Sequence, residues 1–305
     1  MVDPAGRPTR ALPAPGGEGM VTLPGGRSLY CRRWSPSASG GSLTGRPLML
    51  LHGGGEHLGR YEETAARFTR AGFSVVAIDL PGHGRSPGKR GHIPGLLPFM
   101  QDLRTVIASV TDEHHGQRPW LLGHSLGGLL ATRYAIDFGD TIQGLVLSSP
   151  LWALSVHVPL WKRAVAHVIV PIWPSLTMER PRSIQGSVLS HDPDVAKRYA
   201  EDPLVHFRAS VQLYTEARRW IDALPQWLAR LTVPVLVLQA GDDHVASAEA
   251  TARLFPRIGS ADKTLIVYEG YYHELFNETG KDKVFHDLFR WFHAQGVAIN
   301  GGVSP

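Results

Sequence analysis

A serine lies between glycines in the sequence Gly-His-Ser-Leu-Gly at residues 123–127. The segment follows a short apolar run at 120–122, which predicts a strand, and it precedes an apolar helix. In that context G-x-S-x-G is a nucleophile elbow, because glycines permit the tight, strained turn that lifts the serine above the sheet. We predict that Ser125 attacks a carbonyl carbon while the amide of Leu126, at the helix start, faces the developing negative charge. The alternative interpretation is an ordinary serine in a glycine-rich turn.

A serine nucleophile needs a base and an acid that orients the base, and after this elbow they follow in the order Asp, His. Asp242 and Asp243 follow a predicted strand at 233–238. Neighbouring residues that leave a strand point in opposite directions, so only one can meet the histidine. We choose Asp243 and keep Asp242 as the alternative. His273 lies in the loop between the last predicted strand and the last predicted helix, so it is the predicted base.

A second backbone donor is needed opposite Leu126 to bind the charged oxygen of the intermediate. The sequence His-Gly-Gly-Gly at 52–55 directly follows a predicted strand at 47–51. Glycines there let the backbone approach a substrate with no side chain in the way. We predict Gly54 as the donor; a merely flexible loop is the other interpretation.

The elements that must position these residues alternate along the chain. Short continuous apolar runs predict strands that are buried on both faces of a parallel sheet. They are at 47–51, 74–78, 120–122, 145–147, 233–238 and 264–268, with helices predicted at 60–71, 97–110 and 284–292. Segments 21–23 and 28–34 flank Pro-Gly-Gly and predict a hairpin at the sheet edge. We therefore predict an α/β fold, with a mostly parallel central sheet flanked by helices.

Residues 151–228 lack this alternation of apolar strands and helices, and we predict that they form a mainly helical cap inserted into the sheet domain. The core is then 19–150 and 229–297, between a flexible Pro/Gly-rich leader at 1–18 and a flexible tail at 298–305. Large apolar residues crowd the first half of the insertion: Trp152, Leu160, Trp161, Val165, Val168, Ile169, Ile172 and Trp173. They form either a contact surface or a small core of the cap itself.

Composition excludes several classes of protein. The 305 residues carry a net charge of +4 with scattered basic side chains, which argues against nucleic acid. The single cysteine, Cys31, cannot form an internal disulfide. The apolar run at 164–178 is too short for a bilayer span and contains prolines. We expect a cytoplasmic protein, with peripheral contact at a membrane as a further expectation.

Several motifs together resemble the monoacylglycerol lipase family of α/β hydrolases, relatives of the lysophospholipases. They are 52–57, 59–61, 79–86 and the serine elbow, followed by 187–190, 202–204, 238–239 and 268–273. The resemblance covers the chain from about Val21 to Phe292. It implies an α/β-hydrolase fold, a helical cap whose apolar face touches a membrane or micelle, a single-chain lipid ester as substrate, and neither a cofactor nor a metal.

The family also surrounds the polar head of its substrate with side chains, and here Glu56, Arg60 and Tyr199 match by position. Where mammalian members carry a histidine three residues beyond the catalytic one, this chain has Phe276. Glu56 and Arg60 could equally be an i,i+4 surface pair. The implied reaction is hydrolysis of a monoacylglycerol to fatty acid and glycerol through an acyl-enzyme on Ser125. The alternatives are a generalist carboxylesterase, a lysophospholipase, and a hydrolase-like scaffold that binds without turnover.

Overall fold

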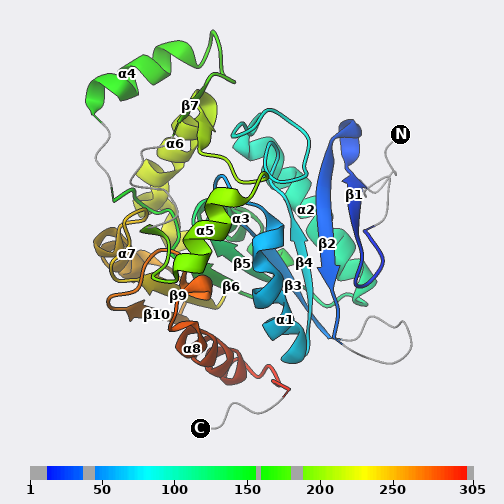
Figure 1. The fold of residues 1–305 in the computed structure, drawn as a ribbon. Helices are drawn as coiled ribbons and strands as arrows, with labels where there is room; N and C mark the ends of the chain where they lie inside the picture. The colour runs from blue at the N-terminus through cyan, green and yellow to red at the C-terminus, as the bar shows by residue number, and fades with distance from the viewer. Residues whose placement is uncertain (1–11, 37–44, 156–158, 180–187, 301–305) are drawn as a thin grey trace.

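The structure is a computed structural model that describes residues 12–36, 45–155, 159–179 and 188–300 (Figure 1). Its main sheet has the strand order β1-β2-β4-β3-β5-β6-β9-β10 within the described residues. The strands are β1 (Glu18–Thr22), β2 (Ser28–Trp34), β3 (Arg46–Leu51), β4 (Phe73–Ile78), β5 (Trp120–His124), β6 (Leu145–Ser148), β9 (Val235–Ala240) and β10 (Lys263–Tyr268). Strand β2 pairs antiparallel with β1 and β4, and the remaining pairs are parallel. The predicted edge hairpin and mostly parallel sheet are confirmed.

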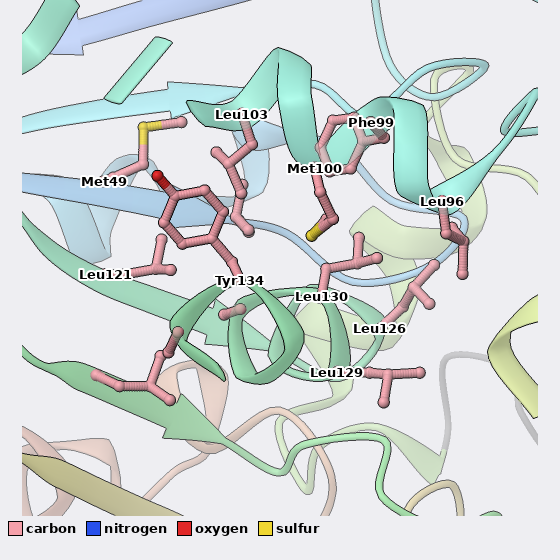
Figure 2. Close-up of a cluster of buried hydrophobic side chains, with 14 of the residues drawn as sticks. Met49, Leu96, Phe99, Met100, Leu103, Leu121, Leu126, Leu129, Leu130 and Tyr134 are labelled. Atoms are coloured by element: carbon pink, nitrogen blue, oxygen red, sulfur yellow. The ribbon is translucent and has the colours of Figure 1, made fainter. Parts of the chain in front are cut away.

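Helices cover both faces of the sheet because its central strands send alternate apolar side chains to either side. On one face α2 (Leu96–Glu113) and α3 (Leu126–Phe138) pack on residues such as Met49 and Leu121 (Figure 2). On the other, α1 (Glu62–Arg70) and α8 (Lys281–Ala294) pack on residues such as Leu50 and Leu122. Helix α7 (Ala248–Leu254) follows β9. The apolar clusters on the two faces fix the strands and so fix the starting points of the loops at their carboxyl ends.

In its described residues, the predicted insertion contains three α-helices and an unpredicted pair of short strands. These are α4 (Leu160–Ile169), α5 (Pro193–Glu201) and α6 (Val211–Trp227), with β7 (Thr177–Glu179) antiparallel to β8 (Arg208–Ser210). Three-residue strands carry too little periodicity to be read from sequence. Helix α6 buries Trp220 and Leu224 in the same apolar cluster as α3. It therefore contacts the helices of the sheet domain as well as α4 of the predicted insertion.

The large apolar residues in the first half of the insertion do not form a small core of the cap. Trp152 is buried in the main core, whereas Trp161, Val165, Val168, Ile172 and Trp173 are exposed. Helix α4, on which three of these lie, stands at the margin of the molecule, away from the sheet (Figure 1). The side chain of Leu160 lies outside the described part of the chain. Apart from Trp152, the large described apolar side chains of this cluster face outward or are half-buried.

The two ends of the described chain pack more closely than flexible segments would. Leu12 is buried in the main core and β1 already begins at Glu18. At the other end Ile299 packs on the second core cluster, and the amide of Asn300 donates to the carbonyl of Ala71. The predicted leader 1–18 and tail 298–305 therefore include described residues, 12–18 and 298–300, some of whose side chains pack on the core. Residues 1–11 and 301–305 lie outside the described chain. No described helix combines the length and hydropathy that a bilayer crossing requires.

Candidate active site

Ser125 occupies the sharp turn between β5 and α3. Its backbone φ of 53° and ψ of −118° are unusual for a residue other than glycine. The turn fits only because its flanking glycines lack side chains. A Cβ on Gly123 would collide with the carbonyl of Gly127, and one on Gly127 would collide with the carbonyls of Leu51 and His52. The elbow therefore packs directly against the end of β3, where the glycine-rich loop begins.

Asp243 and His273 meet across the ends of β9 and β10. Nδ1 of His273 lies 2.8 Å from Oδ2 of Asp243, and both residues are buried. Oδ1 of Asp243 accepts the amides of Val245 and Ala246, each at 2.8 Å. Asp242, the alternative acid, is exposed. Of the two neighbouring carboxylates, the structure brings only Asp243 to the histidine.

This pairing changes the proton affinity of both groups. Burial acts to lower the pKa of His273, but the carboxylates of Asp243, Glu274 and Glu56 outweigh it and the pKa is raised. Burial acts to raise the pKa of Asp243, but His273 and the two backbone amides lower it below its usual range. The pair thus favours an ionised Asp243 that stabilises a protonated His273.

The glycine-rich loop after β3 is fixed from two sides. The amide of Gly53 donates to Oε1 of Glu56 at 2.6 Å, and the carbonyl of Gly53 lies 2.7 Å from Nδ1 of His52. Since the amide of Leu80 donates to Nε2 of His52, the proton of this ring is on Nδ1 and is donated to Gly53. In a trans peptide the N–H points opposite to the carbonyl, so His52 also sets the direction of the Gly54 amide.

One pocket collects most of the predicted site residues. Its lining comprises Gly53, Gly54, Glu56, His124, Ser125, Leu189, Tyr199, Val245, His273 and Glu274. Leu189 and Tyr199 come from the predicted cap, and they form a small apolar cluster with Val245 of the core. A Cβ on Gly54 would lie 3.3 Å from Cδ2 of Leu126, which places the two predicted oxyanion residues side by side. Within the described residues no cluster of His, Cys, Asp or Glu has the makings of a metal site.

Glu56 and Arg60 form a buried pair, so the interpretation as a surface pair is wrong. Arg60 lies in the 3-10 turn Leu58–Tyr61 before α1, and its Nη1 is 2.6 Å from Oε2 of Glu56. Its guanidinium also meets Glu274 in a bidentate pair, at 2.6 and 2.7 Å. Arg60 and Glu274 side chains are 10% and 6% exposed, which marks the pair as internal. Sequence reasoning missed Glu274, and the only signal for it was an acid directly after the predicted base.

Tyr199 reaches the same region from α5. The Cζ atom of Arg60 lies 4.6 Å from the centre of the Tyr199 ring, a cation–π contact. Glu56 and Tyr199 line the pocket, whereas Arg60 lies behind them and is absent from its lining. Phe276 points elsewhere: it is buried, with its ring 5.2 Å from that of Phe285 in the second core cluster. The fourth head-group position of the resemblance is therefore a core position here.

His124 lines the pocket beside the predicted base, with the two ring centres 4.7 Å apart. Burial, with repulsion from His273 next in importance, lowers the pKa of His124 to about 4. It is therefore neutral when a protonated His273 forms. Its Nδ1 lies 3.1 Å from the carbonyl of Ser148 on the neighbouring strand, so the ring also packs the end of β5.

The sheet order and the serine at a positive-φ strand-to-helix turn define the α/β-hydrolase class. Residues 46–280 match the family described as serine aminopeptidase S33. The chain is 34% identical to the monoacylglycerol lipase of Mycolicibacterium smegmatis, over 88% of this chain and 93% of the relative. It is also 34% identical to the human monoglyceride lipase, over 92% and 91%. The solved monoacylglycerol lipase of Paleococcus ferrophilus superposes with a TM-score of 0.77 at 37% identity, over 87% of this chain and 98% of that one. The chain belongs to the monoacylglycerol lipase-like family of α/β hydrolases and is a lipase or esterase of that family.

Proposed function

We propose that this protein hydrolyses carboxylic esters through an acyl-enzyme on Ser125, with His273 as base, Asp243 as its orienting acid, and the amides of Gly54 and Leu126 as the oxyanion hole. The observation that carries the proposal is the 2.8 Å pair of His273 and Asp243 beside the pocket that also holds Ser125 and Gly54. A scaffold that only binds would not require these groups in one place.

The chemistry follows from the proton on His273. With Nδ1–H donating to Asp243, Nε2 carries the lone pair that takes the proton of the serine hydroxyl. The serine oxygen bonds to the ester carbon, the oxyanion is held by the two amides, and the imidazolium returns its proton to the leaving alcohol. A water molecule then repeats the same steps on the acyl-enzyme, releasing the carboxylic acid and regenerating Ser125.

We propose monoacylglycerols as the preferred substrates. The support is the family and the polar groups at one end of the pocket, where Glu56, Glu274 and Tyr199 can bind free hydroxyls of a substrate. A generalist esterase is the second candidate, which a specific observation favours: Arg60 is engaged by two carboxylates, and Phe276 replaces a polar group by a core side chain. Lysophospholipids would be served by the same triad.

The exposed apolar residues of the cap support contact with a lipid surface. Trp161, Val165 and Val168 recur at spacings of four and three residues, so they form one face of α4, and the exposed Ile172 follows in the turn after the helix. We call these four residues the stripe. They are 47–80% exposed, while Ala166 on α4 is buried. A stripe of this kind on an outlying helix would lie in the interface of a membrane or micelle and bring the pocket to its substrate.

The test of the reaction is the Ser125→Ala variant on a chromogenic short-chain ester. We expect turnover to fall to the residual rate that binding and the oxyanion hole give, with a loss on the order of 10³-fold or more. Ser109→Ala, at a half-buried serine of α2 whose hydroxyl donates to the carbonyl of Thr105 and which does not line the pocket, is the matched control and should keep wild-type activity. A Ser125→Ala variant with a tenth of wild-type turnover would exclude the serine mechanism.

A further inference from the structure

The residue directly after the proposed base is a second carboxylate, Glu274. Glu274 is buried and lines the pocket. Its carboxylate oxygens accept hydrogen bonds from the guanidinium of Arg60 and from the side-chain amide of Asn277. The amide of Glu274 donates to the carbonyl of Leu189 in the insertion. The loop after β10 is therefore fixed by hydrogen bonds of both the backbone and the side chain of Glu274.

Arg60 connects Glu274 to the opposite side of the pocket. Its Nη1 is shared between Oε1 of Glu274 and Oε2 of Glu56, at 2.6 Å each. The other oxygen of Glu56 accepts the amide of Gly53 at 2.6 Å and the hydroxyl of Tyr61 at 2.8 Å. One guanidinium thus joins the loop after β3, which carries the proposed oxyanion donor, to the loop after β10, which carries the proposed base, 214 residues away in sequence.

The charges of this bridge do not cancel. Two carboxylates and one guanidinium leave one net negative charge in a buried site, where electrostatic effects are stronger than in water. Burial lowers the pKa of His273, but among the charged groups Asp243, Glu274 and Glu56 have the largest effects and each raises it. The neighbouring His124 is neutral, because its pKa is lowered to about 4. The bridge formed by Glu56, Arg60 and Glu274 therefore carries an excess of negative charge, which favours the imidazolium of His273.

We propose that Glu274 is a positioning residue for the reaction: through Arg60 and Glu56 it locks the oxyanion loop to the histidine loop, and its uncompensated charge stabilises the imidazolium of His273. This inference rests on the proposed function, because it requires His273 to be the base. It goes further in giving Arg60 and Glu56 a structural task inside the protein, in addition to the contact with substrate hydroxyls proposed above for Glu56.

Glu274→Gln removes the negative charge of the side chain and keeps its packing, because glutamine has almost the same shape as glutamate. The readout is the second-order rate of inactivation by a fluorophosphonate as a function of pH, which requires no particular head group. We expect the rate at about pH 8 to fall roughly ten- to a hundredfold, because the geometry of the two loops loosens. The acid limb should move to lower pH, because the imidazolium has lost a stabilising carboxylate.

Two further variants make the result specific. Glu274→Asp keeps the charge but shortens the reach to Arg60, so the rate should fall while the acid limb stays near its wild-type position. Glu278→Gln is the control: Glu278 is equally buried, and binds the amide of Tyr272 and the ring of His191, but does not reach Arg60. It should lower the melting temperature and leave the acid limb unchanged.

An unshifted acid limb in Glu274→Gln, or the same shift in Glu278→Gln, would overturn the inference. If Glu274→Gln does not fold, Glu56→Gln removes the other carboxylate of the bridge and carries the same expectation. Failure of the proposed function gives a different result: the wild-type protein would then show no labelling of Ser125 at any pH, and no acid limb to move.

Discussion

Gln239 donates a side-chain N–H to Oδ2 of Asp243 at 3.3 Å, the same oxygen that lies 2.8 Å from Nδ1 of His273. Gln239 is fully buried on β9, four residues before the acid. With the two backbone amides on Oδ1, Asp243 is surrounded by donors and can only be an acceptor. The proton between Asp243 and His273 therefore belongs to the imidazole.

The first prediction concerns that acceptor. Asp243→Asn would present a donor to Nδ1 of His273 and force the wrong tautomer, so kcat should fall by about 10⁴-fold. The measurement is steady-state hydrolysis of a soluble chromogenic ester. Asp242→Asn, at the exposed neighbouring position, should leave the rate within a factor of about two. A damaging Asp242→Asn with an active Asp243→Asn would reverse the assignment.

The pH dependence follows from the raised pKa of His273. His273 must be neutral to take the serine proton, so activity is present above its pKa and is lost as pH falls through it. Because the carboxylates raise that pKa, the acid limb of kcat/KM should have its midpoint above the ordinary imidazole value of about 6.5. A rate that stays flat from about pH 8 to about pH 5 would mean that another group is the base.

The cap prediction uses the two most exposed residues of the stripe that are not aromatic. Val168 and Ile172 are 65% and 80% exposed, so changing both to Asp costs little stability. We expect weaker cosedimentation with phosphatidylcholine vesicles and slower turnover of long-chain monoacylglycerols, with short soluble esters unaffected. Val267→Asp, at an exposed apolar position on β10, is the matched control. Equal loss on soluble and vesicle-bound substrates would assign the stripe a role in folding.

Head-group preference is tested first on the wild-type protein. A pocket whose polar groups bind substrate hydroxyls is left with unpaired groups when the hydroxyls are absent, so monooleoylglycerol should react faster than methyl oleate. Tyr199→Phe should lower kcat/KM for monooleoylglycerol roughly three- to tenfold, the size of one hydrogen bond, and leave methyl oleate nearly unchanged. Equal rates for both esters in the wild type would support the generalist esterase.

Sequence reasoning located the segments that the structure brings together where each segment is contiguous in the chain. The serine elbow and the glycine-rich loop are short motifs whose backbone demands are local, and the structure places both at strand ends around one pocket. The choice of Asp243 over Asp242 depended on the alternation of neighbouring side chains and on the apolar Val245 two residues after Asp243. These inferences needed no knowledge of tertiary contacts.

Glu274, in contrast, could not be found from the sequence. A glutamate in a loop is usually a solvated residue, and its partner Arg60 lies 214 positions away in a 3-10 turn that was predicted as the start of a helix. For the same reason the sequence could not decide whether Glu56 and Arg60 form a surface pair or belong to the site, because i,i+4 spacing is identical for buried and exposed pairs. The packing of α6 on the sheet domain likewise depends on tertiary contacts that its amphipathic pattern does not specify.

The most direct test of the central claim is the acyl-enzyme itself. The protein is mixed with monooleoylglycerol, quenched with acid within milliseconds, digested and analysed by mass spectrometry. We predict an oleoyl group on the peptide that carries Ser125, and on no other peptide, with the adduct missing from Ser125→Ala. Release of oleic acid by the wild-type protein with no adduct at Ser125 at any quench time, or with undiminished release by Ser125→Ala, would contradict the account.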